Sequence, residues 1–378
     1  MQQADRSGAE PPTPERDRLH RLRLLRSRRV GPVTYRRLVA EHGCAGSALA
    51  ALPAIAAEAG IADYAPFSDE AARAEARLAK RAGARGLFEG DPAWPAALAG
   101  IDDAPPFLWC RGDVTLLARP CVAIVGARGA SSLGLRMAKR LASDLSRSGF
   151  TVVSGLARGI DAAAHEGALS GGTVAVTGGG VDVPYPPETE ALMGRIADHG
   201  LILSEQPMGL APRARHFPAR NRIVSALCRG VVVVEAAARS GTLITARCAA
   251  DQGREVLAVP GHPFDGRASG CNALLRDGAT LVRGAEDVIE ALGDPLEPAR
   301  DACGACPEPA NEAPVRPAHE TGPPLAARII GLLGPSPTSE DQVIRDSGAD
   351  AAAVAAQLTT LEIEGVVERR PGGLLALA

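Results

Sequence analysis

A cluster of arginines around a single aromatic side chain is the first stretch with an evident chemistry. Residues 213–227 read RARHFPARNRIVSAL, and four guanidinium groups surround Phe217 there: Arg213, Arg215, Arg220 and Arg222. The whole chain of 378 residues holds only six Phe, three Tyr and two Trp. Because guanidinium groups bind phosphates in bidentate fashion and stack on planar groups, this stretch indicates a site for a flat, polyanionic ligand.

A series of short β-branched runs must position that site. The runs cover residues 121–125, 151–154, 173–177, 201–204, 231–235, 255–259 and 279–282. Continuous apolar strands separated by helical stretches predict an α/β fold, with a mainly parallel sheet and helices on both faces. Such a sheet binds ligands at the carboxyl ends of its strands.

The turns at that edge carry glycine, arginine and small hydroxyl residues. Those that follow the first and fifth runs are Gly126, Ala127, Arg128, Ser240, Gly241 and Thr242. Glycine lets the backbone approach a ligand, and helix starts supply unpaired amides for anions. We therefore expect an extended anion-binding edge that includes the arginine stretch.

The net charge and the absence of known phosphate-binding motifs disfavour three classes of protein: nucleic-acid-binding polycations, dinucleotide-binding enzymes and P-loop proteins. The net charge of −3 excludes a polycation that binds nucleic acid by total charge alone, so the basic residues must be concentrated locally. Residues 126–131 read GARGAS instead of GxGxxG, and Ser154 stands where a ribose-binding acid would be. Neither of the two lysines follows a glycine, as a P-loop requires. No cofactor is expected.

Catalytic and metal sites are also disfavoured. Asp161 and His165 lie at i and i+4 with Ser154 upstream, which permits a nucleophile, base and acid assignment. Asp161 is better explained as a first-turn acid and His165 as its neighbour on the helix. Tyr185 lies among prolines and is expected to shape a rigid turn. The single CxxC at 303–306 lacks the second pair that a four-ligand zinc site needs.

Composition divides the chain into predicted segments. These are a disordered tail (1–17), a helical SAM-like or helix-hairpin-helix domain (18–82), an extended Rossmann-like domain (83–293) that includes a Pro-rich connector (83–119), a linker (294–322) and a winged-helix domain (323–378). Two alternatives are open for the Gly31–Pro32 turn: it contacts DNA, or it only joins two helices. For the winged-helix domain, the sequence permits binding of DNA, binding of a partner protein or a regulatory contact with the rest of the chain. With no apolar run of about 18 residues, we expect no membrane association and a cytoplasmic location.

Eight strings in this order resemble the DNA-processing protein A family, also called DprA or Smf. They are IVGAR (124–128), SGLARGIDAAAH (154–165), GGGVDVPYP (178–186), SEQPMG (204–209), HFPARNRIVSAL (216–227), EAAARSGTLITA (235–246), REVLAVPG (254–261) and SGCNALLRDGA (269–279). The resemblance implies a Rossmann domain that binds single-stranded DNA and forms a homodimer around residues 262–280. It also implies loading of the RecA recombinase onto incoming strands in natural transformation, with no established enzymatic activity.

The resemblance also assigns site residues. The family's glycine, small residue, arginine turn falls on Gly126, Ala127 and Arg128, where Ala127 lacks the hydroxyl of the usual Ser or Thr. The basic-aromatic motif falls on Phe217, Arg220, Asn221 and Arg222. The residues by themselves predict the same division of labour, with stacking by Phe217 and phosphate contacts by four arginines: Arg128, Arg215, Arg220 and Arg222. Ser240, Gly241 and Thr242 form a further candidate anion site.

Two alternatives remain open at this point. A nucleotide phosphoribohydrolase of the lysine-decarboxylase-like type has a PGGxGTxxE motif that would align with residues 237–245, although Thr245 replaces the catalytic glutamate. A general recombination or phage-defence role would use the same strand-binding surface, so the sequence does not distinguish it from transformation.

Overall fold

The computed structural model describes residues 14–101, 103–295, 325–333, 338–350, 353–354, 357–358, 361, 366–370 and 374–377. They belong to two compact units, Met1–Ala302 and Cys303–Ala378, which we treat separately. Cys303 and Cys306, and most of the predicted tail and linker, lie outside the described residues. Helix α1 already begins at Pro14, inside the stretch predicted as a tail.

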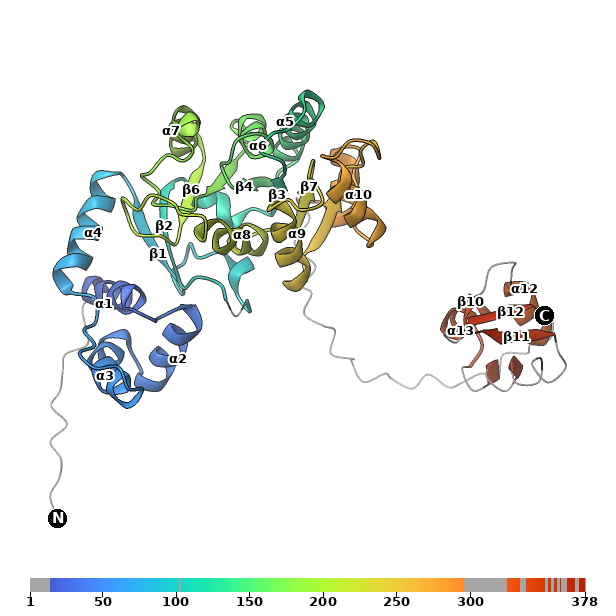
Figure 1. Cartoon of the computed structure of the whole chain (residues 1–378), viewed down its shortest axis with the longest axis horizontal. Helices are drawn as coiled ribbons and strands as arrows, with labels where there is room; N and C mark the ends of the chain where they lie inside the picture. Colours follow the sequence, from blue (N-terminus) through green and yellow to red (C-terminus); the bar gives the residue numbers. More distant parts are fainter. Residues whose placement is uncertain are drawn as a thin grey trace, which may run out of the picture. The chain divides into compact units, whose positions relative to one another are not determined.

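A nine-stranded sheet forms the centre of the first unit (Figure 1). Its spatial order is β1-β2-β6-β5-β4-β3-β7-β8-β9. The strands are β1 Arg85–Phe88, β2 Phe107–Gly112, β3 Cys121–Val125, β4 Thr151–Ser154, β5 Thr173–Val176, β6 Leu201–Ser204, β7 Gly230–Val233, β8 Glu255–Ala258 and β9 Thr280–Leu281. All neighbours from β6 to β9 are parallel.

The prediction of a mainly parallel α/β sheet is confirmed, since each of the seven β-branched runs forms one of the strands β3 to β9. The connector at 83–119 differs from the prediction. Instead of merely packing on the domain, it supplies β1 and β2, which extend the sheet by antiparallel pairing at the β6 edge. Trp109 pairs with Ser204 across that junction.

Helices cover both faces of the sheet, as Figure 1 shows for α5, α6 and α7 on one side and α8 and α9 on the other. They are α5 Ser132–Arg147, α6 Ile160–Ala168, α7 Glu190–His199, α8 His216–Ala226, α9 Thr242–Asp251, α10 Ser269–Arg276 and α11 Ala285–Leu292. Successive strand residues point to opposite faces. Val122 and Ile124 accordingly pack with α5, α6 and α11, whereas Ala123 and Val125 pack with α8, α9 and α10.

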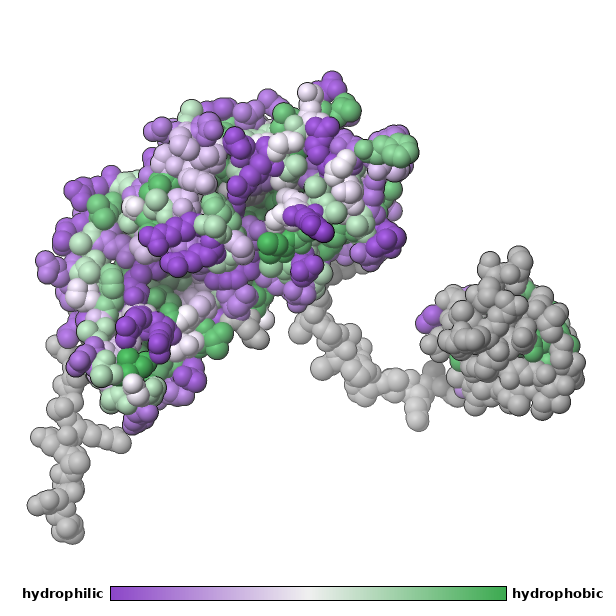
Figure 2. Space-filling view, in the orientation of Figure 1, coloured by the Kyte–Doolittle hydropathy of each residue, from purple (hydrophilic) through white to green (hydrophobic). Residues whose placement is uncertain are grey.

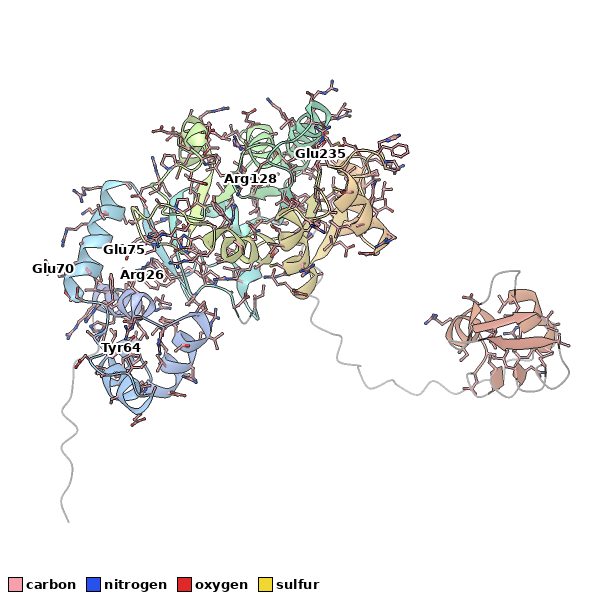
Figure 3. All side chains as sticks on the ribbon, in the orientation of Figure 1. Arg26, Tyr64, Glu70, Glu75, Arg128 and Glu235 are labelled. Atoms are coloured by element: carbon pink, nitrogen blue, oxygen red, sulfur yellow. The ribbon has the colours of Figure 1, made fainter. Side chains whose placement is uncertain are left out.

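The N-terminal helices share the first unit with the sheet. They are α1 Pro14–Arg26, α2 Pro32–His42, α3 Ala45–Glu58 and α4 Asp69–Arg81. Helix α4 packs Ala72 and Ala79 against the sheet. Beside it, Arg26 and Glu75 form an ion pair of 2.8 Å at the junction of helices and sheet (Figure 3). Within the described residues no single helix is long and apolar enough to cross a membrane, although the bent pair α2 and α3 meets that test by length and composition.

The second unit has the helix and strand order of a winged helix. Its described elements are α12 Leu325–Leu332, β10 Thr338–Ser339, α13 Glu340–Ser347, β11 Val367–Arg370 and β12 Leu374–Leu377. The strands form an antiparallel sheet in the order β10-β12-β11. The helix predicted before the hairpin is described only at 353–354, 357–358 and 361, where the chain is helical. Val354, Leu358 and Leu361 are buried with Ile329 and Leu375. The segment boundaries stay predictions.

Candidate nucleic-acid interface

The candidate site lies where the direction of the strand order reverses. The chain runs from β3 outward to β6 and then returns to β7 on the other side of β3. At such a switch point the loops on neighbouring strands diverge and leave a crevice at the carboxyl edge. A pocket of about 400 Å³ is found there, lined by the turns after β3 and β4 and by the first turns of α8 and α9.

The turn after β3 is held close to the start of α6. A Cβ atom at Gly126 would lie 2.5 Å from Ile160, so only glycine fits this contact. The amide of Ile160 donates to the carbonyl of Ala127 at 3.2 Å. Arg128 follows with an exposed side chain. Packing thus fixes the backbone of the turn, whereas the side chain of Arg128 stays accessible to a ligand.

Arg128 and Phe217 meet at the pocket. The Arg128 Cζ lies 5.1 Å from the ring centroid of Phe217, within cation–π range. Phe217 is half-buried, and Gly178 lies beneath its ring, where a Cβ would be 3.2 Å away. Figure 3 shows Arg128 above the strands of the sheet. The predicted pairing of this turn with the aromatic side chain is therefore present in the structure.

Tyr185 and Arg158 join this site although sequence reasoning did not select them. The rings of Tyr185 and Phe217 lie 5.5 Å apart at an interplanar angle of 35°, and Tyr185 is 45% exposed. Arg158 and Arg128 line a smaller adjoining pocket with both rings. Arg158 could have been found from its place in the turn after β4, but the Pro-rich surroundings of Tyr185 gave no signal beyond a rigid turn.

Arg220 does not occupy the exposed position that the sequence suggested. It is only 6% exposed, and its Nη1 donates to the carbonyl of Val176 beneath the pocket. Burial lowers the pKa of Arg220 to about 10, nearby Asp161 opposes this shift, and Arg128 adds to it. A Cβ at Gly155 would overlap the guanidinium group. Arg220 thus supports the pocket floor and also lines the pocket, so its direct phosphate contact stays a prediction.

Asp161 organises the same floor. Burial raises its pKa, while Arg220 and backbone amides of the turns after β3 and β4 oppose that shift. The amide of Ala157 donates to Asp161 Oδ2 at 3.4 Å. This agrees with a first-turn acid that stabilises the local backbone.

Arg222 is also engaged within the protein. Its Nη2 donates to Glu205 Oε2 at 2.6 Å, and its side chain is 15% exposed. The phosphate contact by Arg222 stays a prediction, and it would require a phosphate to compete with the Glu205 carboxylate. Asn221 lines the main pocket, and Arg215 is exposed beside α8.

The turn from Ser240 to Thr242 closes the other wall. Ser240 Oγ donates to Thr242 Oγ1 at 3.0 Å, and Thr242 Oγ1 donates to the carbonyl of Gly126 at 3.0 Å. These hydroxyl groups tie the start of α9 to the turn after β3. The structure brings the predicted residues of both turns together, but it uses the hydroxyl groups for protein contacts.

An internal carboxylate fills the usual phosphate position of a dinucleotide fold. The amide of Ser131, at the start of α5, donates to Glu235 Oε2 at 2.9 Å, and a Cβ at Gly134 would lie 2.5 Å from the Glu235 carboxyl group. Helix N-termini in this position otherwise bind pyrophosphate. Glu235, labelled in Figure 3, therefore blocks that mode and leaves the pocket beside α8 for ligands.

The residues that could have formed a catalytic set, Ser154 and His165, each form a hydrogen bond with a different part of the core. Ser154 Oγ donates to the carbonyl of Ile124 at 2.7 Å, and His165 Nδ1 lies 2.7 Å from Thr173 Oγ1. Burial lowers the pKa of His165 to about 3. These residues stabilise the core and do not form a nucleophile and base pair. Among the residues described, no group of His, Cys, Asp and Glu could hold a metal ion.

Family models match most of the chain. The model for DNA recombination-mediator protein A matches residues 85–293. The model for the DprA-like N-terminal HHH domain matches residues 15–77, and that for the DprA winged helix domain matches residues 310–373.

Curated relatives and solved structures agree with these matches. The DNA processing protein DprA of Streptococcus pneumoniae is 45% identical over 53% of this chain and 71% of that protein. The putative DNA processing protein DprA of Mycobacterium tuberculosis is 39% identical over 78% of this chain and 77% of that protein. The X-ray structure of DprA from Streptococcus pneumoniae has a TM-score of 0.56 and 41% identity, covering 60% of this chain and 78% of that one. DNA processing protein A of Helicobacter pylori, studied for its single-stranded DNA binding mode, has a TM-score of 0.51 and 32% identity, covering 55% and 95%.

Proposed function

The chain belongs to the DNA recombination-mediator protein A family, and from this membership we propose that it binds single-stranded DNA at the carboxyl edge of its sheet. In this proposal it is a non-catalytic mediator that works in the cytoplasm, protects incoming DNA and loads RecA during natural transformation. A general recombination or defence role would use the same surface.

The observation that carries this proposal is the position of Arg128 over Phe217, next to the exposed ring of Tyr185. Single-stranded DNA exposes the faces of its bases, and each base stacked on an aromatic side chain contributes about 1–3 kcal/mol. A duplex hides those faces. The pairing of an aromatic platform with a free guanidinium group therefore favours the single strand.

Exposed arginines at this edge supply the phosphate contacts. Arg128, Arg158 and Arg215 are exposed, whereas Arg220 and Arg222 are engaged inside the protein. Three neutralised phosphates on a single strand give a logarithmic salt slope of about −2, or a roughly 20-fold loss of affinity between about 50 and 200 mM salt. The sequence alone had suggested four contacts and a slope of about −3. Because Arg128 also lowers the pKa of Arg220, a bound phosphate would relieve repulsion between them.

Several features support a non-catalytic role. Asp161 is the only carboxylate among the described residues that line the main pocket, and backbone amides oppose the rise in its pKa. Thr245, which stands where a phosphoribohydrolase would have its glutamate, is 3% exposed. Release of free base from nucleoside monophosphates would support the hydrolase alternative instead.

Self-association and RecA binding are further parts of the proposal. Phe264 is 95% exposed in the region 262–280 where the family resemblance implies a homodimer. Its ring lies 5.5 Å from that of His262. Burial of such a side chain against a second copy would remove a large apolar surface from water.

The test is a fluorescence-anisotropy titration of a labelled dT oligonucleotide and of a duplex of the same length, each with and without RecA. The proposal expects tighter binding of the single strand and faster RecA filament formation on it. Equal affinity for both DNA forms would contradict the stacking site.

A further inference from the structure

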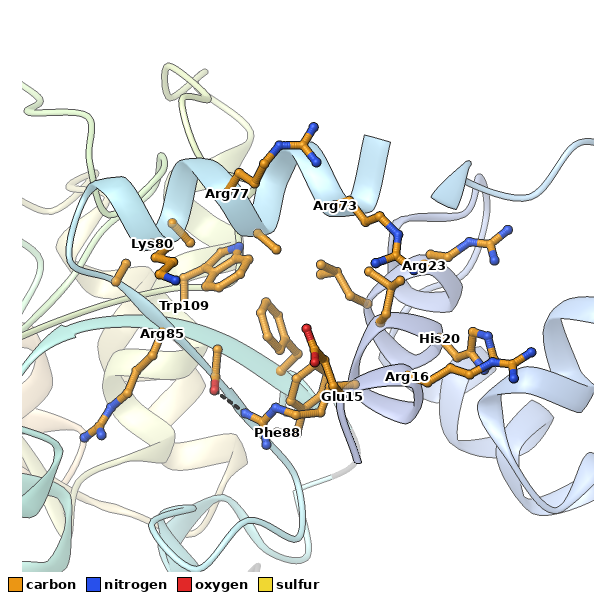
Figure 4. Close-up of a pocket in the computed structure, with 18 of the residues that line it drawn as sticks. Glu15, Arg16, His20, Arg23, Arg73, Arg77, Lys80, Arg85, Phe88 and Trp109 are labelled. Carbon is orange, nitrogen blue, oxygen red and sulfur yellow. Dashed lines mark hydrogen bonds between the residues drawn. The ribbon is translucent and has the colours of Figure 1, made fainter. Parts of the chain in front are cut away.

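A second basic surface lies away from the switch point, in a groove between α1, α4 and β1. The groove has a volume of about 1050 Å³. Seven lysine and arginine side chains line it, against the two carboxylates Glu15 and Asp69. This is a strong local excess in a chain whose net charge is −3. Figure 4 shows Phe88 and Trp109 at its floor, with arginines of both helices at its rim.

The basic side chains form two stripes. Arg16, His20 and Arg23 follow one another at helical spacing on α1, and Arg73, Arg77 and Lys80 do so on α4. Like charges at i and i+4 destabilise a helix slightly, and burial together with Arg16 and Arg23 lowers the pKa of His20. The local structure therefore keeps repelling cations together where a polyanion would neutralise them.

Most of these lysine and arginine side chains have no hydrogen-bond or ion-pair partner within the described part of the protein. Arg18 is bound to Asp91 and to the carbonyl of Gly86, and Arg73 is paired with Asp69. Arg23 donates to the carbonyl of Phe67 and lies 3.8 Å from Asp69. By contrast, the described part of the chain offers no hydrogen-bond or ion-pair partner to the side chains of four others: Arg16, Arg77, Lys80 and Arg85. Glu75, the remaining acid of α4 beyond its first turn, faces the core and binds Arg26 and the indole N–H of Trp109.

The chemistry of the groove favours the sugar–phosphate backbone. Phe88, Phe107 and Trp109 are each at most 5% exposed, so their rings are not available to stack on bases. Contacts here would therefore be electrostatic and independent of sequence. Phe88 ends β1 beside Phe107, which begins β2, so the groove reaches the same edge of the sheet as the carboxyl ends of the parallel strands.

We propose that this groove binds a second stretch of the same DNA strand that the Arg128 and Phe217 edge holds. This inference rests on the proposed function. Four strand spacings separate β4 from β1 in the sheet, which is roughly 20 Å at about 4.8 Å each. About six nucleotides span that distance even at the 3.4 Å rise of stacked DNA. A short oligonucleotide would fill the edge site alone, and a longer one would reach both.

The test compares dT4, which is too short to span that distance, with dT30 on the full chain. The groove variant carries Arg16→Gln, Arg77→Gln and Lys80→Gln, which remove three charges and keep long side chains with good helix propensity. The control carries Arg140→Gln, Arg147→Gln and Arg195→Gln, an equal charge change at exposed positions that line neither pocket. Unchanged melting temperatures show that both variants are folded.

The groove variant should bind dT4 as the wild type does. It should lose at least about tenfold in affinity for dT30 at roughly 100 mM salt, with a salt slope shallower by about 2. The same dT30 affinity and slope as the control would overturn the proposal. Retained dT30 binding with lost binding of poly-glutamate would overturn it in favour of an acidic protein partner. If the wild type binds dT30 but not dT4, and the groove variant binds neither, the edge site is wrong and the groove is supported.

Discussion

The guanidinium group of Arg128, from the turn after β3, lies 5.1 Å from the ring centroid of Phe217, in the first turn of α8. The two residues are far apart in the sequence, so the fold and not a local turn brings them together. Gly126 lets the turn that carries Arg128 pack against Ile160 of α6, and Gly178 leaves room for the ring of Phe217. A cation and an aromatic platform are thereby presented together at the edge of the sheet.

Tyr185 extends this platform, and its loss should weaken binding of single-stranded DNA. Its ring is 5.5 Å from Phe217 and 45% exposed. We expect Tyr185→Ala to reduce dT affinity by at least about fivefold, since one stacked base contributes about 1–3 kcal/mol. Tyr185→Phe keeps the ring and should bind nearly as well as the wild type. Equal losses in both variants would mean that the hydroxyl group, and not stacking, is responsible.

Arg220 is expected to act mainly on stability. Arg220→Ala would leave the buried Asp161 without its cationic neighbour and the carbonyl of Val176 without its donor, a loss of about 1–3 kcal/mol for an unsatisfied buried group. Thermal melting should therefore fall by several degrees. The control Arg215→Ala removes an exposed side chain and should leave melting unchanged while making the salt slope shallower by about 0.7. If Arg220→Ala melts normally and changes only the slope, Arg220 contacts phosphate after all.

His165 should make the fold sensitive to acid. Burial lowers its pKa to about 3 from the usual 6.5. As the pH falls, this imidazole therefore binds a proton in the unfolded chain at a higher pH than in the folded chain. The stability that depends on neutral His165 is present above pH 6.5 and is lost as the pH falls toward 3. At pH 5 this loss is about 2 kcal/mol. Thermal melting at pH 7.5 and pH 5 should show a larger drop in the wild type than in His165→Gln, and equal drops would refute this role.

Gly159 should control the position of the Arg128 turn. Its φ is +80°, and a Cβ there would overlap the carbonyl oxygen of Ala127. Gly159→Ala is therefore expected to lower the melting temperature and to weaken dT binding at least several-fold. Gly129→Ala is the matched control, because a Cβ at Gly129 meets no atom within 4 Å. Normal DNA binding by Gly159→Ala would show that the site tolerates movement of this turn.

The sequence predicted the parallel strands because each is a short, continuous apolar run that must be buried on both faces. It did not predict β1 and β2, since their segment is rich in proline and they join the edge by antiparallel pairing. Arg220 was placed on the surface because arginine is usually exposed. The helical spacing of His216, Arg220 and Ile223 would have predicted the burial of Arg220, because the three residues lie on one buried face of α8.

The central claim is that Phe217 stacks on bases while Arg128 binds phosphate, and salt-dependent dT titrations of two variants test it most directly. Phe217→Ala should weaken binding by about 1–3 kcal/mol with an unchanged salt slope. Arg128→Ala should make the slope shallower by about 0.7. Unchanged dT affinity in both variants, or a shallower slope for Phe217→Ala alone, would contradict the account.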